Sequence, residues 1–210
     1  DSILVAAVKT GQLEEEKIDM LVREILSLVF KAKSHEKEGV NLDAKAHHAF
    51  ARKVAAESAT LLKNDHQVLP LTPKKYKKIA IIGEFAVNPR YQGNGSSEVI
   101  PTQLDKALEI IRSEYGNQFQ IDYAQGYKLS DDNDFSLIEA AKTLAMNADI
   151  ALVFSGLPLH YESEGIDRKH INMPASHDKL LKEVAAVQKN TVVILTNGSA
   201  VAMPWIQEVS

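Results

Sequence analysis

Short apolar runs alternate with amphipathic segments over the second half of the chain. Three of these runs are almost entirely apolar, which is typical of parallel strands that are buried on both faces, and a fourth alternates apolar and polar residues. Each run is too short for an ordinary helix. The predicted strands are residues 79–83, 119–123, 150–154 and 191–195.

Segments with apolar residues at helical spacing separate these predicted strands. They cover residues 102–115, 135–147 and 176–189. Strands and helices that alternate in this way join through right-handed crossovers into a mainly parallel sheet. The pattern therefore predicts an α/β fold in which a mainly parallel sheet is sandwiched between helices.

The amino-terminal part of the chain is predicted to be helical. Apolar residues recur at helical spacing over residues 2–33, with an interruption at 10–12, and again over residues 44–60. The residues between these stretches are polar and charged, as in a linker. We therefore predict a helical segment at 1–33, a linker at 34–43 and an α/β domain at 44–210.

Composition limits the classes of function. At 210 residues, 45% of them hydrophobic, the chain is long enough to bury one good core. A formal net charge of -4 and a pI near 6.0 provide no basic surface for phosphate backbones, so a nucleic-acid partner is not expected. A membrane is not expected either, because no apolar run approaches the ~20 residues that span one.

Two features bear on cellular location. The chain contains no cysteine, so a disulfide framework and a thiolate metal site are both ruled out. Its first residue is Asp1 rather than Met, and the basic region and cleavage site of a signal peptide are missing. We expect the chain to begin inside a longer protein, and a bacterial cytoplasmic enzyme fits these features.

The segment richest in reactive groups is the loop after the predicted strand 150–154. Residues 161–169, with the sequence YESEGIDRK, hold three carboxylates and an arginine. Because ligands of open α/β sheets bind outside the carboxyl ends of the strands, this loop is a candidate site. The alternative is a solvated loop that pairs its charges on the surface, since charge clusters mark functional sites in only some proteins.

A glycine-bearing loop follows the first predicted strand. A phosphate cradle would need G-x-G-x-x-G or G-x-x-x-x-G-K-[ST] at the start of a helix, whereas Gly93 and Gly95 precede two serines and no P-loop lysine follows. The loop instead offers Arg90, Tyr91 and Gln92 beside two hydroxyls, and these groups suit neutral polyols. A plain surface turn is the alternative.

Two further features carry less weight. Residues 195–199 lie at the end of the last predicted strand, although Asn-Gly more often simply makes a turn. Of the seven histidines, His47 and His48 point to different faces of a helix, and no H-E-x-x-H pair occurs. The sequence therefore predicts no metal site, and it predicts no cofactor.

Three segments occur in a specific order. ESATLLKN at 57–64 with LPL at 69–71 comes first, RYQGNGSS at 90–97 second, and ESEGIDR at 162–168 with NMP at 172–174 third. They resemble, in turn, the start of the carboxyl-terminal sandwich domain of family 3 glycoside hydrolases, its Y-Q-G-x-G-S-S loop and its E-x-E-G-x-D-R segment. This family is the β-glucosidase and β-xylosidase group.

The resemblance extends over essentially the whole chain. Residues 4–30 look like the last helices of the family's amino-terminal (β/α)8 barrel, and residues 193–205 look like its strand and M-P-W turn. The family pattern would run on past residue 210, so we expect the sandwich domain to be truncated at its carboxyl-terminal end. The implied partner is the (β/α)8 domain of the same parent chain.

The resemblance implies a retaining exo-β-glycosidase that acts on terminal non-reducing β-linked sugars of a β-glycoside or oligosaccharide. Such an enzyme pairs an Asp nucleophile on the barrel with a Glu acid/base on a sandwich-domain loop, and the acid needs a raised pKa. Glu164 matches the acid/base position, with Glu162 as the alternative. The residues implied to bind substrate or shape the loop are Arg90, Tyr91, Gln92, Ser96, Ser97, Asp167 and Arg168.

Two expectations follow for the chain itself. Arg168 should orient Asp167 or Glu162 through a bidentate pair rather than touch substrate. The S-D-W motif that carries the family's nucleophile does not occur in the sequence, so the chain alone is expected to be inactive. The alternative function is a non-catalytic sugar-binding or domain-packing module.

Overall fold

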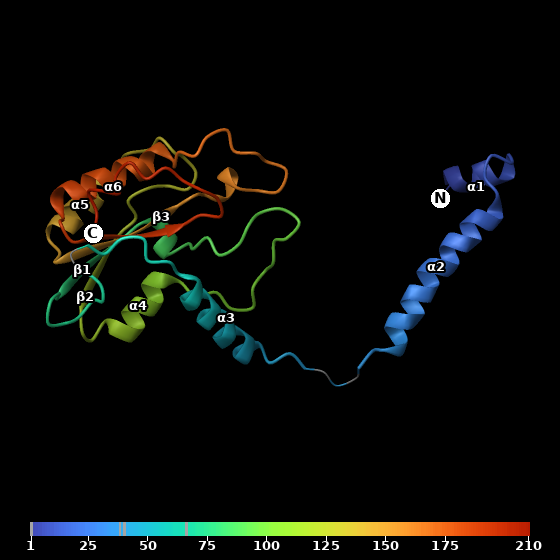
Figure 1. Ribbon diagram of the computed structural model, residues 1–210, viewed down its shortest axis with the longest axis horizontal. Coiled ribbons are helices and arrows are strands. Elements are labelled where there is room, and N and C mark those ends of the chain that lie inside the picture. Colours follow the sequence, from blue (N-terminus) through green and yellow to red (C-terminus); the bar gives the residue numbers. More distant parts are fainter. Residues whose placement is uncertain (1, 38, 40, 66) are drawn as a thin grey trace. The chain divides into compact units, whose positions relative to one another are not determined.

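A four-stranded sheet organises the carboxyl-terminal part of the computed structural model, which describes residues 2–37, 39, 41–65 and 67–210 (Figure 1). The strands lie in the order β2-β1-β3-β4, and each neighbouring pair is parallel. Their bounds are β1 Lys78–Ile82, β2 Gln120–Ala124, β3 Ile150–Gly156 and β4 Thr191–Thr196. The predicted α/β class with a mainly parallel sheet is confirmed.

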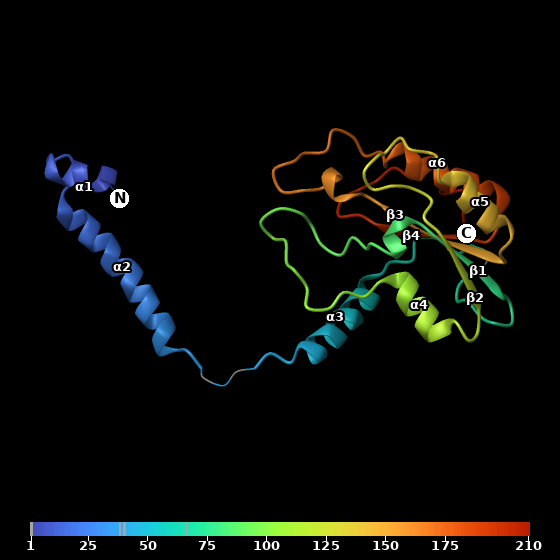
Figure 2. The same cartoon turned by 180° about the vertical axis from the view of Figure 1, so that it is seen from behind.

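Helices connect the strands and cover both faces of the sheet. Helices α5 and α6 pack on one face and α4 packs on the other (Figure 1 and Figure 2). The predicted helix at 102–115 begins later than expected, because the backbone at Lys106 is still extended. The bounds are α4 Ala107–Tyr115, α5 Ile138–Met146 and α6 Ala175–Val187, with short 3-10 helices η1 Glu84–Ala86 and η2 Leu159–Tyr161.

Alternation along the central strands builds a core on each face. In β1, Ala80 and Ile82 belong to the core beneath α5 and α6. Their neighbours Ile79 and Ile81 belong to the opposite core, together with Leu108 of α4. Because both faces of this strand are buried, nearly every position in it is apolar. The edge strand β2 is less buried, which explains its alternating sequence.

The predicted amino-terminal helices are confirmed as α1 Ser2–Lys9, α2 Glu15–Ser34 and α3 Ala44–Ser58. The contacts divide the chain into two compact units, one ending at Ala51 and the other spanning Arg52–Ser210. The division into 1–33, 34–43 and 44–210 stays a prediction, and residues 1, 38 and 40 lie outside the described residues. Among the helices that the structure describes, none has the length and apolarity to cross a membrane.

A buried histidine lies beside the carboxyl end of β3. His177 of α6 has no exposed surface, and its Nδ1 lies 3.1 Å from the Oγ of Ser155. Its ring stacks at 3.7 Å, centroid to centroid, on Tyr127. Burial lowers the pKa of His177 to about 4, although the nearby charge of Asp132 acts in the opposite direction. The imidazole is therefore neutral at pH 7.

We expect the free energy of unfolding to fall between pH 6.5 and about pH 4 because of His177. In this window the unfolded chain binds a proton at the imidazole and the folded chain does not, so acid favours unfolding by up to about 3 kcal/mol. Urea titrations at about pH 7 and about pH 4.5 measure the effect. His177→Gln should reduce this pH dependence, whereas the exposed control His170→Gln should keep it. Equal pH dependence in wild type and His177→Gln would contradict the assignment.

Candidate active site at the carboxyl ends of the strands

Three loops meet where β1, β3 and β4 end. Because these strands are parallel neighbours, the loops that follow them leave from the same edge of the sheet. The green loop after β1 and the orange loop after β3 extend from the same side of the domain in both views (Figure 1 and Figure 2). A cleft of about 440 Å³ is lined by all three loops, through Arg90, Gly93, Asn94, Tyr161, Glu162, Ser163, Glu164, Ile166, Asp167, Arg168, Gly198 and Ser199.

The first of these loops turns away from the sheet at Gly83. This residue has φ 113°, a backbone conformation that side-chain-bearing residues rarely adopt. A Cβ at this position would lie 2.0 Å from the carbonyl oxygen of Phe154 in β3. Glycine is therefore required for the chain to leave β1 so close to its neighbouring strand.

Glu162 ties the three loops together. Its Oε2 accepts hydrogen bonds from Arg90 Nη1, in the loop after β1, and from the backbone N–H of Gly198, at 2.8 Å. Its Oε1 accepts one from Ser199 Oγ. Burial raises the pKa of Glu162, but these hydrogen bonds, led by that from Ser199, and the charge of Arg90 outweigh it and lower the pKa to about 2. Glu162 is a fixed anion near neutral pH.

Arg168 does not make the bidentate pair expected for it. Its Nη1 donates to Ser199 Oγ at 2.7 Å and to the carbonyl oxygen of Ala200 at 2.8 Å. A single long ion pair, of 4.0 Å, joins it to Oε1 of Glu162, and among the described residues no ion pair joins Arg168 to Asp167. The prediction is wrong because the Ser199 hydroxyl stands between the two charged groups, accepting from Arg168 and donating to Glu162.

Glu164 lies only two residues further along but has different surroundings. Its Oε2 accepts hydrogen bonds from the backbone N–H of Ser96, at 2.8 Å, and from the Ser96 hydroxyl. The residue is exposed, and these hydrogen bonds, led by that from the hydroxyl, lower its pKa. The two loops approach so closely here that a Cβ at Gly95 would lie 2.6 Å from the Cβ of Glu164. Only glycine leaves room for this approach.

The structure brings some of the predicted site residues together and leaves others outside. The cleft is lined by Arg90, Glu162, Glu164, Asp167 and Arg168. Ser96 reaches it through its hydrogen bonds to Glu164. The predicted residues that do not line the cleft are Tyr91, Gln92 and Ser97. Whether each of these residues binds substrate or shapes a loop stays a prediction.

The contribution of the loop after β4 was not predicted from the sequence. Residues 195–199 were a candidate edge, but none of them was among the predicted site residues. Gly198 and Ser199 supply two of the hydrogen bonds to Glu162. The signal that could have found them is topological, because the loop after a strand adjacent to β3 must emerge beside the loop after β3 itself.

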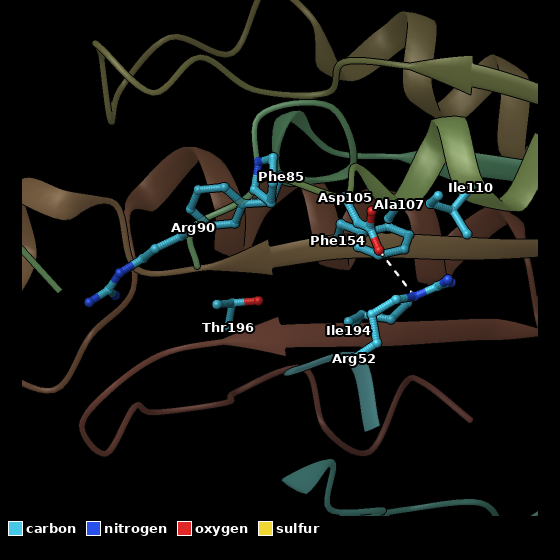
Figure 3. A pocket seen from close by; sticks show the side chains of 10 residues that line it. Arg52, Phe85, Arg90, Asp105, Ala107, Ile110, Phe154, Ile194 and Thr196 are labelled. Carbon is cyan, nitrogen blue, oxygen red and sulfur yellow. Dashed lines mark ion pairs between the residues drawn. The ribbon is translucent and has the colours of Figure 1, made fainter. Parts of the chain in front are cut away.

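A second cavity, of about 330 Å³, is lined mainly by apolar side chains (Figure 3). Phe85, Phe154 and Ile194 contribute to its wall. Two of the charged side chains in its wall, Arg52 and Asp105, form an ion pair with each other, with Nε 3.1 Å from Oδ2. This cavity lacks the glutamates and suits apolar groups. Across the described ranges, no group of three or more histidine, aspartate or glutamate side chains is placed to hold a metal ion.

Comparisons with known proteins agree with one another. The family model that represents the sequences of the glycosyl hydrolase family 3 C-terminal domain matches residues 59–210. The thermostable beta-glucosidase B of Acetivibrio thermocellus is 48% identical over 210 residues, which are 100% of this chain and 28% of that protein. An exo-alpha-(1->6)-L-arabinopyranosidase of Bifidobacterium longum is 39% identical over 218 residues, covering 98% of this chain and 28% of that protein.

A solved structure gives the same result. The crystal structure of a GH3 beta-glucosidase from Bifidobacterium adolescentis aligns with a TM-score of 0.78 at 38% sequence identity. The alignment covers 99% of this chain and 30% of that structure. The chain therefore spans less than a third of the length of these relatives.

We expect the same substitution to have different effects at the two glutamates. Glu162→Gln leaves the Arg90 side chain, only 8% exposed, without its counter-charge, so the free energy of unfolding near neutral pH should fall by roughly 3 kcal/mol. Glu164→Gln removes an exposed anion and should cost less than about 1 kcal/mol. Urea unfolding measures both values.

The pH dependence provides a second check on Glu162. Its folded pKa of about 2 lies below the ordinary value of 4.5, so its ionisation stabilises the fold above pH 4.5. That contribution is lost as the pH falls towards 2, and the deficit of Glu162→Gln should shrink over the same range. If Glu162→Gln and Glu164→Gln lowered the free energy of unfolding by the same small amount at every pH, this would contradict the role of Glu162 in joining the three loops.

Proposed function

Because this chain belongs to glycoside hydrolase family 3, we propose that it supplies the acid/base loop of a retaining exo-β-glycosidase. The proposed substrates are β-glycosides or oligosaccharides with a terminal non-reducing β-linked sugar. The names of its relatives, a beta-glucosidase and an exo-arabinopyranosidase, support an exo-acting glycosidase as the parent protein.

Glu164 is the proposed acid/base residue, and one observation carries this choice. Both oxygens of Glu162 are engaged, by Arg90 and Gly198 at Oε2 and by Ser199 at Oε1. In the described part of the chain, the hydrogen bonds to the Glu164 side chain fall on Oε2 alone. Its Oε1 is left to meet a glycosidic oxygen.

The proposed mechanism uses Glu164 twice. As an acid it would protonate the leaving oxygen while a nucleophilic carboxylate forms a covalent glycosyl intermediate. As a base it would then take a proton from the water that hydrolyses this intermediate. Acid catalysis requires a raised pKa, and a second carboxylate about 5 to 5.5 Å away would raise that of Glu164, because two neighbouring anions disfavour each other's ionisation.

The nucleophile would come from a (β/α)8 domain of the same parent chain. The 210 residues contain no S-D-W segment, which supports this division of the site and the proposed inactivity of the chain alone. Helix α2 supports it independently, because Ile25, Leu28 and Phe30 are exposed large apolar residues of the kind that pack against another domain. In this proposal residues 1–33 form the end of the barrel domain.

A non-catalytic domain-packing module is the second candidate. The observation that favours it is the lowered pKa of Glu164, since a carboxyl that is ionised near neutral pH does not act as a general acid. The two candidates differ in whether an additional neighbouring carboxylate raises this pKa in the longer protein.

We expect a longer protein that includes the upstream domain to hydrolyse p-nitrophenyl β-glycosides, while the 210-residue chain does not. In the longer protein, Glu164→Ala should lower kcat by ~10²–10⁴-fold for substrates with poor leaving groups, because these need protonation. For activated leaving groups kcat/KM should change far less, although kcat still falls because the second step has lost its general base. Glu98→Gln, an exposed carboxylate in the neighbouring loop, is the control and should leave both rates unchanged.

Added azide provides a separate readout of the acid/base role. It should restore kcat of the Glu164→Ala variant on substrates with activated leaving groups, for which breakdown of the glycosyl intermediate limits turnover, because azide attacks this intermediate without needing a general base. Wild-type turnover of poor leaving groups by the Glu164→Ala variant would rule out the assignment. An inert longer protein on every sugar tested would favour the non-catalytic module.

A further inference from the structure

Gln92 closes the loop that reaches Glu164. Its Nε2 donates to the carbonyl oxygen of Val99 at 3.0 Å, and its Oε1 accepts from the backbone N–H of the same residue, also at 3.0 Å. We refer to this pair of hydrogen bonds as the amide clamp. One side-chain amide thus satisfies both backbone groups of Val99, as a partner strand would. The clamp fixes the two ends of segment 93–98.

The clamped segment carries the groups that contact Glu164. Ser96 directs both its backbone N–H and its hydroxyl at Oε2 of Glu164. The carbonyl oxygen of Asn94 accepts a hydrogen bond from the backbone N–H of Glu164 at 3.2 Å. Because three hydrogen bonds converge on one residue from a short segment, the position of that segment determines the position of the carboxylate.

Side-chain burial contributes little to holding this segment in place. Val99 and Ile100, at its far end, are 63% and 92% exposed. A loop with few buried apolar contacts opens readily, since little free energy opposes the entropy gained on opening. The hydrogen bonds of the amide clamp therefore carry much of the order in this part of the chain.

The side-chain amide of Gln92 makes its hydrogen bonds within the loop, and the residue does not line the cleft. A side-chain amide has two N–H donors and one carbonyl acceptor. One donor is used on Val99 and Nε2 also lies 3.2 Å from the hydroxyl of Tyr91, while the carbonyl accepts from Val99. Both donors are thus engaged within the loop, which favours loop shaping over sugar binding for this residue.

We propose that Gln92 is a positioning residue, which holds Ser96 against Glu164 through the amide clamp. The catalytic consequence rests on the proposed function, because it matters for turnover only if Glu164 is the acid/base. The placement of the carboxylate does not depend on that function and can be measured in the 210-residue chain itself.

The test is an NMR titration of the Glu164 side-chain carboxyl in this chain. In the wild type the Ser96 hydrogen bonds should hold its pKa below the usual value, and Ser96→Ala should raise it. Gln92→Ala should raise it in the same direction, and the double variant should exceed Ser96→Ala only by the contribution of the Ser96 backbone N–H, which Ser96→Ala leaves in place, so the two effects should not add in full. Val99→Ala is the matched control and should change nothing, since the clamp uses only backbone atoms of Val99.

Gln92→Met covers the case in which Gln92→Ala fails to fold. It keeps the length of the side chain without a charge and without the amide groups of the clamp, so the pKa of Glu164 should again rise. A pKa unchanged by either Gln92 variant while Ser96→Ala raises it would overturn the proposal. So would a pKa unchanged in all variants, because the contact between Ser96 and Glu164 would then be absent in solution.

A kinetic readout extends the test to the longer protein. Gln92→Ala should lower kcat for poor leaving groups about tenfold with little change in KM, because acid catalysis depends on where the carboxyl sits. A KM increase with unchanged kcat would indicate substrate binding by Gln92 and would overturn the positioning role. If every longer protein is inert, the proposed function fails while the titration still decides the role of Gln92.

Discussion

The largely shielded carboxylate of Glu162 is the constraint on which the site depends. A parallel sheet brings the ends of β1, β3 and β4 to one edge, but the ladder of backbone hydrogen bonds stops where the strands stop. Beyond that point the loops need other bonds to keep a fixed arrangement. One anion, shared between Arg90 and two groups of the loop after β4, supplies them. Removing either charge would leave the other largely shielded from solvent and without its nearest partner.

This arrangement separates two glutamates that lie two residues apart in the chain. Glu162 gives both oxygens to the scaffold, whereas the described hydrogen bonds to the Glu164 side chain come from Ser96 in the loop after β1, and Glu164 stays exposed. A reactive carboxyl needs a defined position and a pKa that can change with its surroundings. In the proposed role of Glu164, the tie at Glu162 would hold the position of the loop and leave the pKa of Glu164 free to change with its neighbours.

Much of the fold was predictable from the sequence, because a strand buried on both faces must be apolar at nearly every position, as β1 is. The start of α4 was less predictable, since local spacing does not show where the backbone at Lys106 stays extended. The partner of Arg168 could not be predicted at all. It depends on the Ser199 hydroxyl, which comes from a distant loop and reaches Arg168 only after the sheet has formed.

The position of β4 at the edge of the sheet has a practical consequence. Among the strands that the structure describes, β4 is paired only with β3, and its outer side is covered at the start of the strand, where the backbone N–H of Ser210 donates to the carbonyl oxygen of Thr191 at 2.9 Å. An unpaired row of backbone N–H and C=O groups is a template for any extended segment that can add to it. The remainder of this edge is the part of the sheet to which an added strand would pair, and a charged residue placed there would disfavour such pairing.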